Sequence, residues 1–201
     1  QQGSEGNIFD PADLQELVLP PTLVTLELKY LGLLGLPPLP DATLKRLVWY
    51  ERGYGSHIVR RTGPLPSSLL HLECKLGSQI ELPDLPPFLQ HLTLDSSTLR
   101  THILPALPAT LRHLSVRRCK LTQPPENLPL QLTYLDCSMN QLAELPALPN
   151  TLEHLDCTCN PLMTAPLPGL PDSLLHLSCA SNGLTALPAL PARLTFLNCN
   201  R

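Results

Sequence analysis

The sequence predicts a solenoid of short repeats with one strand each, and three observations support this prediction. A leucine recurs at intervals of 20 to 25 residues as the first position of the motif L-x-x-L-x-L/C. Proline accounts for 24 of the 201 residues, more than twice its usual share of about 5%, and lies mostly between the motifs. Aromatic residues are only 4%, so leucine must build the core. This combination is typical of leucine-rich repeats.

Nine copies of the motif align in one register. Each is expected to form a short strand, a turn and a return segment, and the strands should stack in parallel about 4.8 Å apart on the concave face. The copies span residues 21–40, 41–66, 67–86, 87–108, 109–129, 130–149, 150–171, 172–191 and 192–201. Their first leucines are Leu23, Leu44, Leu69, Leu89, Leu111, Leu132, Leu152, Leu174 and Leu194.

The return segments carry the pattern L-P-x-L-P, as in residues 145–149 and 187–191. Proline is excluded from helix interiors and favours an extended, polyproline-like path. The convex side is therefore expected to be extended rather than helical.

The two ends differ from the repeats. Residues 1–18 are expected to form an N-terminal segment with a short helical cap, with Asp10 as N-cap and Pro11 at the first helical position, ahead of a repeat domain over 19–201. No capping segment follows the last repeat, so Leu194, Leu197 and Cys199 would leave one side of the core uncovered. The chain is therefore expected to be a fragment, or to be covered there by a partner or a second copy.

Alternation along each strand assigns the side chains to two faces. The first, fourth and sixth positions should point into the core, and the third, fifth and seventh onto the concave surface. Cysteine shares the sixth position with leucine, valine and tryptophan, so it should act there as a small hydrophobe. The seven cysteines are an odd number, which favours reduced thiols over a disulfide framework.

The ninth position predicts a ladder of asparagines at the turn, formed by Asn140, Asn160 and Asn182. Ser97 and Cys119 occupy the same position and should replace asparagine in earlier repeats. Cys159 lies one place before the ladder and is expected to be the most exposed and most reactive thiol.

The concave columns supply the candidate binding residues, because the concave face of a solenoid is its usual binding surface. Five of the seven histidines fall in the third column. The column could be a stabilising ladder, a ligand surface, or, through His154, His176, Asp136 and Asp156, a divalent-metal site. It could also gain charge in mild acid, which would weaken binding of a basic partner at pH 5. The predicted binding residues are Arg46, His71, Glu73, His91, Thr93, Asp95, His113, Arg117, Tyr134, Asp136, His154, Asp156 and His176.

Two basic groups add further candidates. The second repeat is the longest, and its insert, WYERGYGSHIVRRTG (49–63), contributes Tyr50, Tyr54, Arg60 and Arg61. Tyrosine and arginine are frequent hot-spot residues in interfaces. The other group, in the fifth repeat, consists of Arg112, Arg117, Arg118 and Lys120.

Other function classes find little support. The net charge of −3 gives no argument for nucleic acid, and no apolar run is long enough to span a membrane. No nucleophile-elbow, zinc-protease or phosphate-loop motif occurs. Ser115, His113 and Asp136 can be drawn as a triad, but a flat ladder offers no closed pocket or oxyanion donor. The chain is thus expected to be neither an enzyme nor a cofactor carrier.

The segments LPALPNTLEHLDCTCNPL (145–162) and LPALPARLTFLNCN (187–200) resemble the leucine-rich repeats of IpaH/YopM-type bacterial effectors. The resemblance covers residues 19–201. It implies type III secretion into a host cell, to the cytoplasm or nucleus, where the repeats would bind host proteins. Many such proteins also carry a cysteine-dependent ubiquitin ligase domain after the repeats, and nothing in this chain looks like that domain. The expected function is host-target recognition, and the alternative is substrate recognition for an effector ubiquitin ligase whose catalytic domain lies outside this chain.

Overall fold

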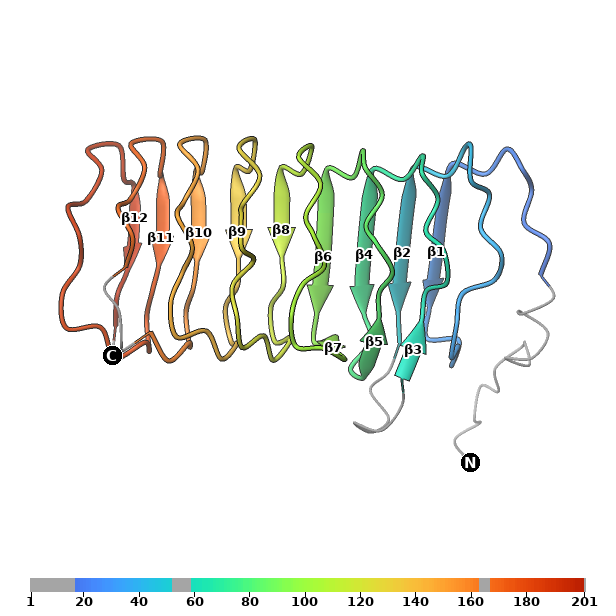
Figure 1. Cartoon of the computed structure of the whole chain (residues 1–201), viewed down its shortest axis with the longest axis horizontal. Helices are drawn as coiled ribbons and strands as arrows, with labels where there is room; N and C mark the ends of the chain where they lie inside the picture. Colours follow the sequence, from blue (N-terminus) through green and yellow to red (C-terminus); the bar gives the residue numbers. More distant parts are fainter. Residues whose placement is uncertain (1–16, 52–58, 163–166, 201) are drawn as a thin grey trace, which may run out of the picture.

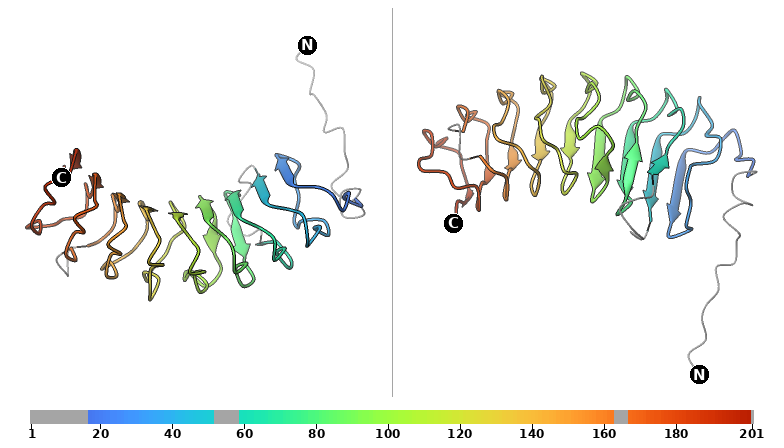
Figure 2. Two further views of the ribbon diagram at one scale, coloured as in Figure 1. Left: turned by 90° about the horizontal axis from the view of Figure 1, so that it is seen from above. Right: turned by 60° about the horizontal axis from the view of Figure 1, so that its bottom comes forward.

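A computed structural model describes residues 17–51, 59–162 and 167–200, which form a curved solenoid of parallel strands (Figure 1). The main sheet has nine strands in the order β1-β2-β4-β6-β8-β9-β10-β11-β12, so each repeat adds one strand beside the previous one. Figure 2 shows this sheet on the concave side of the curve. The strands are Thr25–Lys29 (β1), Arg46–Tyr50 (β2), His71–Lys75 (β4), His91–Asp95 (β6), His113–Ser115 (β8), Tyr134–Asp136 (β9), His154–Asp156 (β10), His176–Ser178 (β11) and Phe196–Asn198 (β12). The predicted leucine-rich repeat solenoid is confirmed.

Pairing between repeats keeps equivalent positions side by side. His71 pairs with His91, and Leu72 with Leu92, across β4 and β6. Both leucines are fully buried, as are Leu69 and Leu89 at the first position. The core is therefore a stack of equivalent leucine layers, each covered by its neighbours.

The cysteines at the sixth position behave as the small hydrophobes that were predicted. Cys74, Cys137, Cys157 and Cys179 are buried in the leucine core. Burial raises the pKa of the Cys74 thiol to about 12 and that of Cys179 to about 11, so these groups stay as thiols. All seven cysteines are free, and Cys159 and Cys199 are the exposed ones.

The convex side is extended, as expected, but it also carries a second sheet that the sequence pattern did not predict. The return segments of the second, third and fourth repeats form a parallel three-stranded sheet of Val59–Arg61 (β3), Gln79–Glu81 (β5) and Thr98–Leu99 (β7). The return segments of the second to eighth repeats each end in a proline whose carbonyl accepts a hydrogen bond from the amide of the first leucine of the next repeat. The Leu111 amide donates to Pro108 O at 3.0 Å, and the Leu152 amide to Pro149 O at 3.0 Å. In these repeats, proline thus closes the turn into the next strand.

The asparagine ladder is confirmed at all three predicted positions. Asn160 Nδ2 donates to the carbonyls of Cys157 at 2.9 Å and of Cys137, one repeat earlier, at 3.0 Å. Its Oδ1 accepts from the Leu142 amide at 3.1 Å. Cys119 and Ser97 replace asparagine as predicted, since each donates to a carbonyl of the preceding repeat, Leu94 O and Cys74 O respectively. The ladder ties each turn to its neighbour inside the core.

A second ladder, of hydroxyl groups, lies just before the first leucine of the repeats. Thr151 Oγ1 donates to the carbonyls of Leu130 and Leu132 at 2.8 Å each. The equivalent hydroxyls that bond back to the preceding repeat are Thr43, Ser68, Thr110 and Ser173. The recurring Thr-Leu or Ser-Leu dipeptide in the sequence is the signal that could have revealed this ladder.

The turns after β1, β6, β8, β9, β10 and β11 use left-handed backbone at the eighth position. Tyr30, Ser96, Arg118, Met139, Cys159 and Ser181 all have φ between 52° and 60°. Cys159 is therefore exposed because its residue turns the chain away from the sheet, one place before the buried Asn160.

The predicted helical cap within residues 8–18 lies almost entirely outside the described residues, and Leu17 and Val18 at its end are exposed and not helical. Within the described part of the chain, no helix is long and apolar enough to cross a bilayer.

Candidate partner-binding surface

The third column of the concave face is a continuous stack of seven rings. His71, His91 and His113 stack in sequence with ring centroids 3.9 Å apart, and interplanar angles of 11° and 6°. The stack continues through Tyr134, His154 and His176 to Phe196 with centroid separations of 4.0 to 4.3 Å. The spacing of parallel strands fixes this arrangement, because equivalent side chains on adjacent strands must lie face to face. Only the ring edges are left to contact a ligand.

The stack disfavours protonation of four imidazoles, those of His71, His91, His113 and His154. Burial is the main cause, and it lowers the pKa of His71, His113 and His154, and that of His91 to about 3. Repulsion from Arg46 or from a protonated neighbouring histidine adds to the effect of burial. The prediction that this column gains charge in mild acid is therefore wrong for His91, which stays neutral at pH 5. The physical reason is that a proton on one ring would be partly desolvated and would repel the next ring.

Glu73 is the centre of a charged cluster where β1, β2 and β4 meet. Its carboxylate accepts a hydrogen bond from Tyr50 and lies 3.4 Å from Lys75 Nζ and 3.7 Å from Arg46 Nη2. Burial alone would raise the pKa of Glu73, but these hydrogen bonds and charges outweigh burial and lower it. Burial, with the bond to Glu73, raises the pKa of Tyr50 to about 12. Arg46 also donates to Nε2 of His71, so the cluster joins one end of the ring stack.

The other half of the concave face is acidic and carries no cationic side chain on β9 to β12. Asp136 Oδ1 accepts from Ser138 N at 2.9 Å and from its hydroxyl at 2.6 Å. Asp156 Oδ1 likewise accepts from Thr158 N at 2.9 Å. Each carboxylate is thus turned along its own strand toward the seventh position.

This geometry does not support the metal site considered for His154, His176, Asp136 and Asp156. The two imidazoles stack in near-parallel planes with centroids 4.0 Å apart, so their nitrogens do not converge on one point. Among the residues that the structure describes, no group of three or more His, Cys, Asp or Glu side chains could hold a metal ion.

The remaining concave candidates lie on β6 or just after β8, in the half nearer the N-terminus. His91 Nε2 is 3.2 Å from Thr93 Oγ1, and Thr93 is nearly buried. Asp95 accepts from Ser96 Oγ at 3.1 Å. Arg117 is exposed, with its Nη2 3.6 Å from Met139 Sδ. Arg118 and Lys120 of the same basic group have left-handed backbone, and Arg118 Nε lies 3.1 Å from the same Met139 sulfur.

The insert of the second repeat differs from its predicted role. Tyr50 belongs to the concave face on β2, and Tyr54 lies outside the described residues. Arg61 is exposed on β3, 3.0 Å from Glu81. Arg60 was expected to bind a partner, but its side chain is buried: Nε donates to Leu33 O at 3.0 Å and Nη1 donates to Ser78 Oγ. It points inward because side chains alternate along β3, which places buried Arg60 between half-buried Val59 and exposed Arg61.

Arg60 is part of a buried polar network that sequence reasoning missed. Glu51 is buried, and its carboxylate accepts from the amides of Gly32 and Leu33 at 2.9 and 3.1 Å and from Trp49 Nε1 at 3.1 Å. Burial lowers the pKa of Arg60, and the charge of Glu51 opposes this shift. The two charged residues hold Leu33 from both sides, which fixes the return segment of the first repeat.

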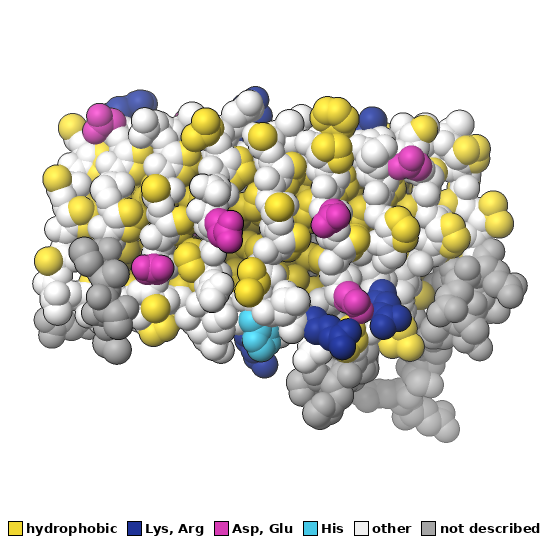
Figure 3. Space-filling model, viewed as in Figure 1, with side chains coloured by type: hydrophobic (Ala, Val, Ile, Leu, Met, Phe, Trp, Pro, Cys, Tyr) yellow, Lys and Arg dark blue, Asp and Glu magenta, His cyan; other side chains and the backbone are white. Residues whose placement is uncertain are grey.

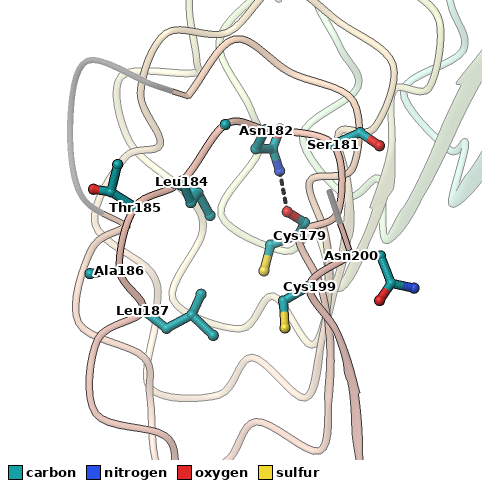
Figure 4. A pocket seen from close by; sticks show the side chains of 10 residues that line it. Cys179, Ser181, Asn182, Leu184, Thr185, Ala186, Leu187, Cys199 and Asn200 are labelled. Atoms are coloured by element: carbon teal, nitrogen blue, oxygen red, sulfur yellow. Dashed lines mark hydrogen bonds between the residues drawn. The ribbon is translucent and has the colours of Figure 1, made fainter.

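A cavity of about 810 Å³ opens beside β12 (Figure 4). Figure 4 shows Cys179, Cys199, Leu184 and Leu187 among the side chains that line this cavity. These are the inner positions of the repeat, which are buried in earlier copies, and here Leu197 and Cys199 are exposed. The cavity is therefore an uncovered cross-section of the core rather than a built ligand site.

Two solved structures are similar to this chain. YopM from Yersinia enterocolitica WA-314 shares 35% identity over 91% of this chain with a TM-score of 0.79. YopM from Yersinia pestis, described as a leucine-rich effector protein, shares 30% identity over 87% of this chain with a TM-score of 0.71. This chain spans 38% and 48% of the length of those two chains. Comparisons with protein-family models and with curated proteins found no match.

Proposed function

The chain is a leucine-rich repeat domain of the YopM type, and on that premise we propose that it recognises a host protein for a secreted bacterial effector. The observation that carries this proposal is the unbroken stack of seven rings across the concave face, with charged groups beside it. A long, open and rigid surface suits a macromolecular partner better than a small molecule, which needs a concave pocket.

The distribution of charge suggests how such a partner would lie. Lys75 and Arg117 face the concave side in the half of the surface nearer the N-terminus, whereas Asp136 and Asp156 occupy the other half. Acidic groups of the partner would meet the first half and basic groups the second. The edges of the stacked rings would supply neutral hydrogen-bonding groups between them.

Charge reversal on the concave face tests this proposal. In pull-down from host-cell lysate, the double variant Lys75→Glu and Arg117→Glu should lose at least tenfold of any captured partner. Both side chains are substantially exposed, so the fold should be kept. The control is Glu144→Arg, an exposed charge reversal on a return segment. Equal loss of the partner with both variants, or with neither, would contradict concave binding.

Delivery and location follow from the same proposal. An effector of this type would enter the host cell by type III secretion and act in the cytoplasm or nucleus. Secretion of a reporter fusion of the natural gene product, compared in strains with and without the secretion apparatus, tests delivery. A captured partner that becomes ubiquitylated only with the full-length gene product would instead favour substrate recognition for a ligase.

A further inference from the structure

We propose that the convex side carries a second docking site, a groove beside β5 and β7 that takes an acidic peptide segment with aliphatic side chains from a partner protein. The site is separate from the concave surface. It lies on the return segments of the third and fourth repeats, where the structure has both an apolar floor and an excess of positive charge.

The groove arises from a mismatch in repeat length. The third repeat, 67–86, is two residues shorter than the fourth, 87–108. The two return segments run together as far as Arg100, whose amide donates to Ile80 O at 3.3 Å. The fourth repeat then turns sharply: the His102 amide donates to Leu99 O at 3.0 Å, and His102 has a φ of 57°. The extra residues therefore leave the neighbouring segment and open a cavity of about 700 Å³.

The floor of this cavity is apolar. Ile80 and Leu99 are buried beneath it, and Leu82 and Leu104 line it further along. Ile103 lines the cavity and is 43% exposed, although it is a large aliphatic residue. An exposed aliphatic group beside a lined cavity offers a partner's leucine or isoleucine a place to be buried.

Arginines dominate the rim. Arg61 Nε lies 3.0 Å and Arg100 Nη1 3.8 Å from the same oxygen of Glu81, so two cations share one carboxylate. Figure 3 shows this cluster at the lower edge of the convex side as two dark-blue groups on either side of a magenta one. The side chains of Arg61 and Arg100 are 72% and 61% exposed, so each guanidinium is open to a ligand. One positive charge remains uncompensated within the cluster.

The chemistry of the occupant follows from these two features. Guanidinium groups bind carboxylates through paired N–H donors, and the Glu81 interaction engages Arg61 through Nε only. A partner carboxylate can therefore bind at the rim while an adjacent aliphatic side chain enters the cavity. A basic segment would meet the charge excess at the rim and be repelled, which makes the site selective for acidic–aliphatic sequences.

Labelled peptides test this site directly. The probe is a fluorescein-labelled peptide with glutamates flanking a Leu-Leu pair, compared with peptides in which lysine replaces glutamate or serine replaces leucine. Fluorescence anisotropy should detect binding of the first peptide with a Kd of about 100 μM or tighter, and at least tenfold weaker binding of the other two. Equal binding of the lysine peptide would overturn the proposal.

Variants of groove residues then test whether the peptide binds at this site. The double variant Arg100→Gln and Ile103→Ser should weaken binding of the glutamate–leucine peptide at least tenfold. The matched control, Arg193→Gln and Leu190→Ser, changes an exposed arginine and an exposed leucine far from the groove and should leave binding unchanged. The proposal fails if the peptide does not bind, or if the two double variants behave alike while both keep the far-UV circular dichroism of the parent. The concave double variant Lys75→Glu and Arg117→Glu should bind the peptide normally, which separates this site from the proposed function.

Discussion

His91 lies inside a ring stack that resists protonation, and this single residue makes a pH dependence measurable. Its folded-state pKa is about 3, well below the ordinary histidine value. As the pH falls below about 6.5, the unfolded chain therefore takes up a proton that the folded protein does not. The contribution of His91 to the free energy of unfolding is therefore fully present above pH 6.5 and declines as the pH falls from 6.5 toward 3.

Replacing His91 by phenylalanine should flatten this decline. Phe196 already stacks on His176 with a centroid distance of 4.0 Å, so the column accepts a phenyl ring. One excluded proton corresponds to about 1.4 kcal/mol per pH unit, and solvent screening of a half-buried ring reduces this. We expect the slope of unfolding free energy against pH, from 6.5 to 4.5, to fall by about 0.5 kcal/mol per unit. Urea unfolding at several pH values measures it.

Tyr134→Phe is the matched control for His91. It keeps the stack, and the pKa of Tyr134 is raised above its ordinary value by burial, so its hydroxyl does not titrate in this range. The slope should stay that of the parent protein. If His91→Phe also leaves the slope unchanged, the folded protein must bind that proton after all.

The two ladders should differ in energy because one is buried and the other lies near the surface. Asn160→Ala removes bonds to Cys137 O and Cys157 O and leaves the buried Leu142 amide without its acceptor. We expect a loss of about 3 kcal/mol. Thr151→Val removes two bonds at a turn that water reaches, and should cost about 1 kcal/mol. Chemical denaturation gives both values, and a cost for Thr151→Val equal to that of Asn160→Ala would contradict this ranking.

At the scale of elements, the return segment of the first repeat depends on Glu51 and Arg60. Arg60→Met should cost about 3–5 kcal/mol, because it leaves the buried Leu33 carbonyl without its donor and the Glu51 carboxylate without the opposite charge. The double variant with Glu51→Gln should cost clearly less than the sum of the two single changes. Thermal unfolding of the four proteins completes the cycle, and strict additivity would argue against coupling.

Which elements could be predicted depends on whether their signal repeats. The strands, the inward cysteines and the asparagine ladder follow from positions that recur in copy after copy, so period and alternation suffice. The sheet of β3, β5 and β7 uses two or three residues per repeat, with β-branched Val59, Ile80 and Thr98, inside segments dominated by proline. So short a pattern does not stand out from the sequence.

Part of the candidate surface was beyond sequence reasoning for a related reason. Alternation placed the histidines on the concave face, but the burial of Arg60 depends on partners 27 and 18 residues away in neighbouring repeats. The shifted histidine pKa values likewise come from contacts between strands. Such contacts depend on how the repeats stack, so the sequence of a single repeat does not predict them.

For the whole molecule, quasi-one-dimensional stacking makes the two ends of the described solenoid unlike its middle. β12 pairs only with β11, and its residues Phe196 and Leu197 are 46% and 40% exposed. An edge strand with apolar side chains is a template for association with another chain.

The 201-residue chain prepared alone should therefore associate through this end. Sedimentation velocity in the presence of reductant, which keeps Cys199 as a thiol, should give a sedimentation coefficient that rises with protein concentration. Leu197→Glu places a charge at the open core and should suppress that rise. Leu130→Glu adds the same charge at a turn residue that is already 81% exposed, so it should leave association intact. A concentration-independent monomer in the parent chain would refute association at this end. If Leu197→Glu and Leu130→Glu suppress the rise equally, association depends on net charge and not on the uncovered core, because only Leu197 is at the uncovered core.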